Sequence, residues 1–137
     1  GGGLAEDEIG APSLLLLPSR QKLGASLVAK FGGPQLQPVA PGEVDLVFAL
    51  RYEPSDQTVR AHDPEVLALR WPALSPQATQ TLHGVLDTMS RDAIGEVVLK
   101  KLSQRELALA DTMGFEPQKI EVVHDGVVVL FGPKGRR

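Results

Sequence analysis

Two neighbouring residues near the end of the chain, His124 and Asp125, are the first candidates for chemistry. A histidine beside a carboxylate can serve in general acid–base catalysis or in metal binding. The sequence around them, I-E-V-V-H-D-G-V-V-V-L-F (120–131), favours another interpretation, because Asp-Gly between alternating apolar residues is a strong signal for a hairpin turn. Neighbouring strand residues also point to opposite faces. We interpret the pair as the corner of a hairpin.

The other candidate residues also have structural explanations. His62-Asp63-Pro64 resembles an acid–base or metal pair, yet Asp-Pro is ordinary turn chemistry. His83 lies on the flank of a helical apolar stripe and is interpreted as a surface residue. No two histidines have the short spacing of metal ligands, and a zinc site needs three or four converging ligands. The sequence therefore predicts no catalytic residue, no metal site and no cofactor.

Length and composition set limits on fold and function. The 137 residues fit a single domain, 1–137, and with 42% hydrophobic but only 4% aromatic residues the core must be aliphatic. A net charge of −3 argues against nucleic-acid binding. The absence of cysteine removes disulfides and thiolate chemistry. We expect residues 1–11 to be a flexible or truncated start and residues 132–137 to be a basic, solvated tail.

The first half of the chain has the pattern of β-structure. Residues 13–17 and 22–31 are predicted to form a hairpin, and the proline-rich segment 32–42 a loop. Alternation predicts a strand over 44–53, and Pro54-Ser55-Asp56-Gln57 a turn. The chain then returns as a strand over 58–71, with a bend at Asp63-Pro64.

Helical signals dominate the next part of the chain. Ser75 and Pro76 can begin a helix, which the apolar spacing extends to about Lys101. Ser103 and Glu106 form a capping box for a short second helix that ends at Gly114. A final hairpin is predicted from strands over 118–124 and 127–131. The apolar stripe of the long helix consists of Ala78, Leu82, Val85, Leu86, Met89 and Ala93.

Together these elements predict an α+β fold. In it, a strongly twisted antiparallel sheet of about four to six strands wraps on one long helix in the C-terminal half, with a short second helix and a final β-hairpin. If helix and sheet leave a groove between them, it is apolar and suits an apolar ligand. The candidate residues for binding such a ligand are Leu46, Phe48, Leu50, Leu82, Leu86 and Met89.

Several stretches resemble a known family. L-R-Y-E-P-S-D-Q-T-V-R-A-H (50–62), V-L-A-L-R-W (66–71) and L-A-L-A-D-T-M-G (107–114) are similar to the YceB-like bacterial lipoproteins, a family of unknown function. The likeness includes the hairpin around His124 and the leucine strand 14–17. The resemblance implies a fold similar to the tubular lipid-binding proteins, residence in the periplasm and binding of a lipid or another apolar molecule. It also implies outer-membrane anchoring by an N-terminal lipid in the precursor, and it carries over no catalytic residue.

Three functions are compatible with the sequence. The first is a non-enzymatic envelope protein that binds a lipid or another apolar ligand between helix and sheet. The second is a structural or partner-binding periplasmic module, which would use a sheet edge or an exposed Trp71 to bind an envelope protein. The third is a hydrolase or metal enzyme built on His62, Asp63 and His124, which requires these groups to lie within bonding distance. Membrane association is expected only through an upstream lipid anchor that this chain does not contain.

Overall fold

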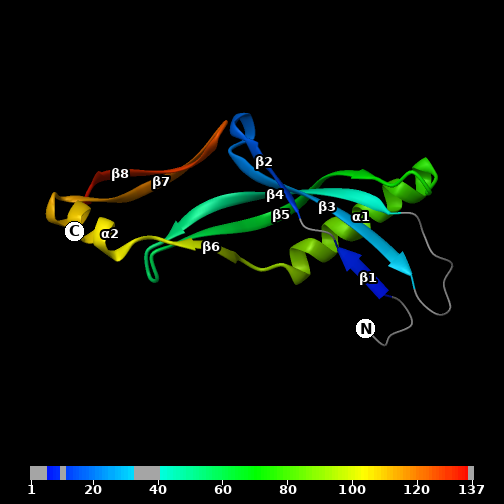
Figure 1. Cartoon of the computed structure of the whole chain (residues 1–137), viewed down its shortest axis with the longest axis horizontal. Coiled ribbons are helices and arrows are strands. Elements are labelled where there is room, and N and C mark those ends of the chain that lie inside the picture. Colours follow the sequence, from blue (N-terminus) through cyan, green and yellow to red (C-terminus); the bar gives the residue numbers. More distant parts are fainter. Residues whose placement is uncertain (1–5, 10–11, 33–40, 136–137) are drawn as a thin grey trace. The chain divides into compact units, whose positions relative to one another are not determined.

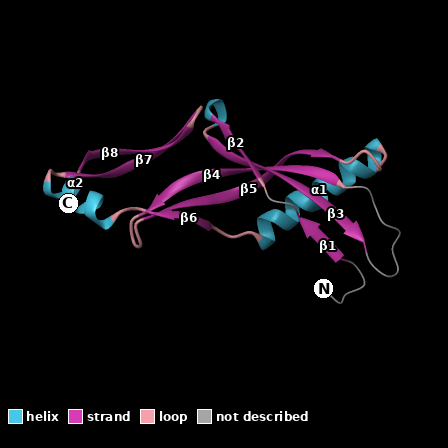
Figure 2. Cartoon of the chain, in the orientation of Figure 1, coloured by secondary structure: helices cyan, strands magenta, loops and turns pink. Residues whose placement is uncertain are grey.

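The computed structural model describes residues 6–9, 12–32 and 41–135, with the backbone alone described at 6–9 and 30–32. In these residues the fold is α+β (Figures 1 and 2). The elements are β1 (Glu6–Ile9), β2 (Ser13–Leu17), a 3-10 turn η1 (Pro18–Arg20), β3 (Lys22–Gly32), β4 (Gly42–Glu53), β5 (Thr58–Arg70), α1 (Pro76–Ala93), β6 (Val97–Lys101), α2 (Gln104–Thr112), β7 (Phe115–Val123) and β8 (Gly126–Pro133).

The strands form one larger sheet and one separate hairpin. Within the described residues the larger sheet has six strands, in the order β1-β3-β4-β5-β6 with β2 also paired to β3. The pairs β1–β3, β5–β6 and β7–β8 are antiparallel. The predicted α+β class, strand number, second helix and final hairpin are therefore confirmed.

The predicted long helix is wrong at its C-terminal end. Ser75 caps α1 as expected, its Oγ accepting a hydrogen bond from the Ala78 amide at 3.1 Å. The helix stops at Ala93, however, because Ile94 is extended and Val97–Lys101 forms β6 against β5. Gly95 and the β-branched residues Ile94, Val97 and Val98 disfavour helix and favour strand. At 1.5 Å per residue, the 18 residues of α1 span about 27 Å.

Much of the apolar stripe on α1 is left accessible. Val85 and Met89 are 49% and 56% exposed, and Ser90 is the buried residue of the helix. A hydrogen bond fixes the helix to β5: the Asp87 carboxylate accepts from the Val66 amide at 2.9 Å. A sheet wrapped on this helix stays a prediction.

The N-terminal segment departs from its prediction as well. Glu6–Ile9, expected within a flexible start, forms β1 and pairs with Ala29–Gly32 of β3. Strand pairing uses backbone groups, so this segment joins the edge of the sheet without an alternating apolar pattern. The expected loop over 32–42 lies mostly outside the described residues, since positions 33–40 are not described.

The chain, predicted to be a single domain, divides into two compact units. The first comprises Gly1–Leu15, Gly24–Val47 and Pro64–Ile94, and its buried residues include Val47, Val66 and Trp71. The second comprises Leu16–Leu23, Phe48–Asp63 and Gly95–Arg137, and its buried residues include Val59, Ala61, Leu107 and Val122. As the composition predicts, aliphatic residues dominate both sets.

An ion pair between buried Asp45 and the half-exposed Arg70 also shapes the first unit. Asp45 lies on β4 with Val44 and Leu46 on either side, and all three are buried. The Arg70 guanidinium donates two hydrogen bonds to the Asp45 carboxylate, at 2.8 and 2.9 Å. These bonds lower the pKa of Asp45. The pairing explains how a carboxylate lies between two core residues.

The contact of Gly42 with Trp71 gives a test of this unit. A Cβ atom on Gly42 would overlap Cδ2 and Cε3 of the buried indole, so we expect Gly42→Ala to destabilise the protein by about 1–3 kcal/mol through overpacking. Urea unfolding followed by the fluorescence of Trp71, the single tryptophan, measures this change.

Gly84→Ala is the matched control. Gly84 lies inside α1, and apart from its chain neighbours and the backbone of its own helix a methyl group added there would meet no described atom within 4 Å, so the same substitution should stabilise the helix by up to about 1 kcal/mol. Equal stability of the two variants would contradict the proposed packing of Trp71 against Gly42.

Candidate ligand-binding site

Two cavities in the second unit share the side chain of Leu107, the buried residue of α2. The smaller has a volume of about 420 Å³ and a mainly apolar lining. It is lined by Val59, Leu99, Lys100, Leu102, Glu106, Leu107, Val127, Val129 and Phe131. We call it the apolar cavity.

Alternation along β8 supplies one wall of the apolar cavity. Val127, Val129 and Phe131 are two residues apart and therefore share one face of the strand. The sheet contributes Val59 of β5 and Lys100 of β6, which are direct partners in the β5–β6 register. The lining therefore combines α2 with residues of the larger sheet and of the β7–β8 hairpin, and Figure 1 shows α2 connecting β6 to β7.

Local hydrogen bonds fix the segment that carries α2. The Leu102 amide donates to the Gln57 carbonyl at 2.9 Å, which joins the end of β6 to the β4–β5 turn. Ser103 Oγ then accepts from the Glu106 amide at 3.3 Å, so the predicted N-cap of the helix is confirmed. Gly114, the predicted terminator, has a φ of 83°. These bonds hold Leu107 in its position between the two cavities.

The β7–β8 hairpin is held by an unusual partner, the side chain of Gln21. Its Nε2 donates to the Val122 carbonyl and its Oε1 accepts from the Val122 amide, both at 2.9 Å. The carboxamide thus pairs with β7 as the backbone of a neighbouring strand would. At the other end of the hairpin, the Lys134 amide donates to the Gly114 carbonyl at 3.0 Å, and the Lys134 ammonium pairs with Asp111. The predicted solvated tail, 132–137, therefore starts within the fold, since Gly132 and Pro133 belong to β8 and Lys134 is hydrogen-bonded.

The larger cavity is more polar. Its volume is about 600 Å³, and its lining includes Tyr52, Phe115 and the carboxylates of Asp111 and Glu116. Burial, together with Asp56 and Glu116, raises the pKa of Tyr52. Asp111 is paired with Lys134, and Glu116 accepts a hydrogen bond from the Gly135 amide at 3.3 Å. Both carboxylates thus have a partner from the C-terminal segment.

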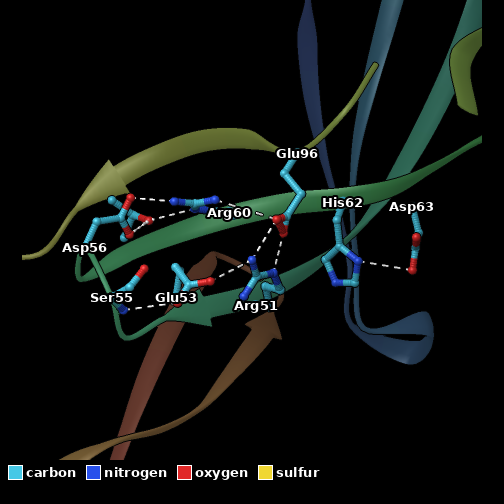
Figure 3. Close-up of polar contacts among 9 residues, drawn as sticks. Arg51, Glu53, Ser55, Asp56, Arg60, His62, Asp63 and Glu96 are labelled. Atoms are coloured by element: carbon cyan, nitrogen blue, oxygen red, sulfur yellow. Dashed lines mark hydrogen bonds and ion pairs between the residues drawn. The ribbon is translucent and has the colours of Figure 1, made fainter. Parts of the chain in front are cut away.

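A network of charged side chains precedes β6 (Figure 3). Glu96 lies between two arginines: Arg51 Nη2 donates to Glu96 Oε2 at 2.6 Å, and Arg60 Nη1 lies 3.7 Å from the same oxygen. Arg51 also binds Glu53, and Arg60 also binds Asp56. Hydrogen bonding from Arg51 is the main cause of the lowered pKa of Glu96. The geometry of this network indicates a structural clamp, which holds Glu96, the residue before β6, against β4 and β5.

The structure confirms the hairpin corner at His124-Asp125, but the two turn residues lie one position earlier than the expected Asp125-Gly126. Val123 pairs with Gly126, so the two turn residues are His124 and Asp125, and neither has a positive φ. The His124 side chain is 89% exposed, and its Nε2 lies 3.9 Å from the Asp125 carboxylate. An Asp-Gly turn with left-handed residues is therefore not the one that forms.

The other residues considered for chemistry are not part of the lining of the apolar cavity. His62 Nδ1 lies 3.1 Å from the Asp63 carboxylate, and Asp63 has a φ of 52° at the predicted bend in β5. His83 is half-buried on α1. In the part of the chain that the structure describes, no three or more His, Cys, Asp or Glu side chains form a group that could hold a metal ion.

The six predicted ligand-binding residues lie in both units. Leu46 is buried and Met89 is 56% exposed, while the other four are half-buried. None of them lines either of the two cavities described above. Phe48 and Leu50 nevertheless share by alternation the face of β4 that carries Tyr52, which lines the larger cavity. The expected exposure of Trp71 is wrong, since its side chain is 4% exposed.

The predicted long helix explains why the sequence does not indicate the apolar cavity. A helix that extends to Lys101 contains Leu99 and Lys100 and leaves β6 out of the sheet. The period-two pattern of Val127, Val129 and Phe131 is visible in the sequence and indicates one apolar face on β8. Neither α1 nor α2 has the length and hydropathy needed to cross a lipid bilayer.

The Gln21 carboxamide can be tested by substitution. We expect Gln21→Ala to remove two hydrogen bonds to Val122 and to speed hydrogen exchange of the Val122 amide by roughly tenfold, since each bond contributes about 0.5–1.5 kcal/mol. NMR exchange rates measure the effect. Gln57→Ala is the matched control, because Gln57 has a similar left-handed φ of 61° and does not bind Val122. Unchanged exchange in Gln21→Ala would contradict the pairing.

The clamp at Glu96 predicts a pH dependence. Its pKa is lowered in the folded state, so its contribution to stability is present above the unfolded pKa of about 4.3 and is lost as pH falls through the folded value. We expect Glu96→Gln to be less stable than wild type at pH 7 and to lose less stability on acidification below pH about 5. Urea midpoints from circular dichroism at several pH values measure this. Glu65→Gln, at an exposed position, should retain the wild-type profile.

Comparisons with known proteins complete the description of the site. A scan of the chain against models of protein families gives no match. Searches of the curated proteins and of the solved structures give no match either.

Proposed function

We propose that this chain is a non-enzymatic module that binds a lipid or another apolar molecule in the apolar cavity. The observation that carries the proposal is the lining of that cavity, in which seven of nine residues are apolar, the exceptions being Lys100 and Glu106. Its volume of about 420 Å³ falls within the range of about 300–1,000 Å³ that is typical of small-molecule sites. Its apolar walls come from β5, β6, α2 and β8.

The physical driving force would be the transfer of aliphatic groups out of water. Each buried methylene contributes about 0.8 kcal/mol, which is about a fourfold gain in affinity. Because the cavity walls are aliphatic apart from Phe131, they favour alkyl chains over flat aromatic molecules that gain from ring stacking. The ligand class that fits best is therefore an acyl or alkyl chain.

The groove between helix and sheet that the sequence predicts is a second location for such a ligand. Its residues are Leu46, Phe48, Leu50, Leu82, Leu86 and Met89. A groove lined by them requires a strongly twisted sheet that wraps on the helix beginning at Ser75. The partly exposed stripe of α1 supports this location, since Val85 and Met89 have apolar surface to cover. Substitutions in the apolar cavity distinguish the two locations.

The resemblance to the YceB-like lipoproteins supports a location in the cell envelope. On this proposal the chain works in the periplasm, anchored to the outer membrane through an N-terminal lipid of its precursor. A protein that carries single lipid molecules between aqueous compartments and membranes needs a cavity that shields the acyl chain from water.

A partner-binding module is the alternative, and exposed apolar side chains favour it. Leu109 and Met113, at the C-terminal end of α2, are 64% and 65% exposed, and Val128 and Leu130 lie on the face of β8 opposite to the apolar cavity. Apolar side chains gathered on a surface mark interaction sites. An envelope protein that covers them would give this chain a structural role with no small-molecule ligand.

Two valines of β8 separate these functions. Val127 lines the apolar cavity and Val128 does not, yet their exposures are 38% and 39%, so a charge at either position should cost folding similar free energy. We expect Val127→Glu to weaken binding of the neutral fluorescent probe N-phenyl-naphthylamine by about tenfold or more, because a carboxylate would face an apolar cavity. Val128→Glu should bind the probe within about twofold of wild type.

Fluorescence titration measures probe binding, and circular dichroism confirms that both variants fold. Native mass spectrometry of protein purified from cells should also show a copurifying lipid. If wild type neither binds the probe nor carries a lipid, the proposal is wrong. If Val128→Glu loses binding and Val127→Glu does not, the ligand lies outside the apolar cavity.

A further inference from the structure

A lysine forms part of the wall of the apolar cavity. Lys100 lines the cavity, and no described carboxylate forms an ion pair with its ammonium group. Its partner in the sheet register is Val59, an apolar residue of the same cavity. A lysine can lay its aliphatic stem along such a wall and present its charge at the rim. A ligand in this cavity would therefore meet a positive charge that no described side chain neutralises.

The surrounding segment is also positively charged. From Lys100 to Glu106 the sequence K-K-L-S-Q-R-E carries three cations and one anion, and none of the four is in an ion pair with a described residue. Glu106 is the single carboxylate of the cavity lining and lies in the first turn of α2. There the positive end of the helix dipole already stabilises a carboxylate. No comparable interaction within the segment offsets the positive charges of Lys101 and Arg105.

We propose that the ligand is an amphiphile with an aliphatic chain and an anionic head group, whose head lies at Lys100. This inference rests on the proposed function and names its ligand class. The chain packs against Leu99, Leu107 and Phe131, and the head group supplies a counterion for Lys100. Fatty-acid carboxylates and lipid phosphates share this chemistry. A neutral alkyl ligand would leave the charge of Lys100 without a counterion, and a cationic one would face the three positive charges of the segment.

Three ligands with the same dodecyl chain test the head group: laurate, dodecanol and dodecylamine. Each is used to displace N-phenyl-naphthylamine from the full chain at low ionic strength and below its critical micelle concentration. We expect laurate to bind roughly fivefold more tightly than dodecanol, which is the upper limit for one exposed ion pair, and dodecylamine to bind most weakly, since Lys100 is exposed. Raising the salt concentration should reduce the preference for laurate.

The two lysines of β6 provide the matched variants. Lys100→Met should remove the preference for laurate over dodecanol and leave dodecanol binding unchanged. Lys101→Met, a change of the same charge in the neighbouring residue that does not line the cavity, should keep most of that preference. Glu106→Gln should tighten laurate binding, because it removes the single carboxylate of the lining.

The outcomes separate this inference from the proposed function. If the probe does not bind and no lipid copurifies, or if none of the three ligands displaces the bound probe, the proposed function fails. If dodecanol binds as tightly as laurate, or if Lys100→Met keeps the preference, the proposed function stands and the anionic head at Lys100 is wrong. Tightest binding of dodecylamine, with loss in Glu106→Gln, would also overturn it.

Vesicles distinguish the source of the head group. We expect phosphatidylglycerol vesicles to displace the probe from wild type and less effectively from Lys100→Met, as dissolved laurate does. Binding to vesicles without displacement, together with no effect of dissolved laurate, would assign the basic segment to docking on a membrane surface and would overturn the cavity site. Circular dichroism of each variant confirms folding.

Discussion

The pairing of β6 with β5 is the interaction on which the candidate site depends. It turns Val97–Lys101 into a strand, places Lys100 beside Val59 and brings α2 directly after the sheet. Two interactions outside the ladder support it: the clamp of Arg51 and Arg60 on Glu96 before the strand, and the Leu102–Gln57 hydrogen bond after it. Without this pairing the segment would continue the apolar pattern of α1, and the apolar cavity would lose one of its walls.

A low aromatic content has a direct effect on the packing of this chain. With one tryptophan, one tyrosine and four phenylalanines, large side chains are scarce, and the buried set consists mostly of valine, leucine and alanine. Branched aliphatic side chains on two separate β-structures do not reach across every gap, and Leu107 fills the space between them at one point. Where Leu107 does not fill this space, the side chains that line the cavity lack dispersion contacts, and a ligand would supply them.

Elements that are encoded locally could be predicted from the sequence. Ser75 and Ser103 cap their helices because a hydroxyl three residues before a free amide needs no tertiary partner, and Gly114 ends α2 because it tolerates a positive φ. Strand 44–53 follows its alternation, and the apolar run at 14–17 forms a strand as predicted. The run Val97-Val98-Leu99 could not be assigned from the sequence, since a short apolar run fits a helix and a strand equally well. Its pairing with β5 determines that it forms a strand. The apolar cavity depended on that assignment.

The hydrogen bonds between Gln21 and Val122 join residues that are 101 positions apart in the sequence. Closing so long a loop carries an entropic cost that is incurred before the contact forms, and contacts of this kind slow folding. During synthesis, Gln21 is made 101 residues before its partner in β7. The wall that β8 contributes to the apolar cavity can therefore form only after the strands of the sheet on its other side have been synthesised.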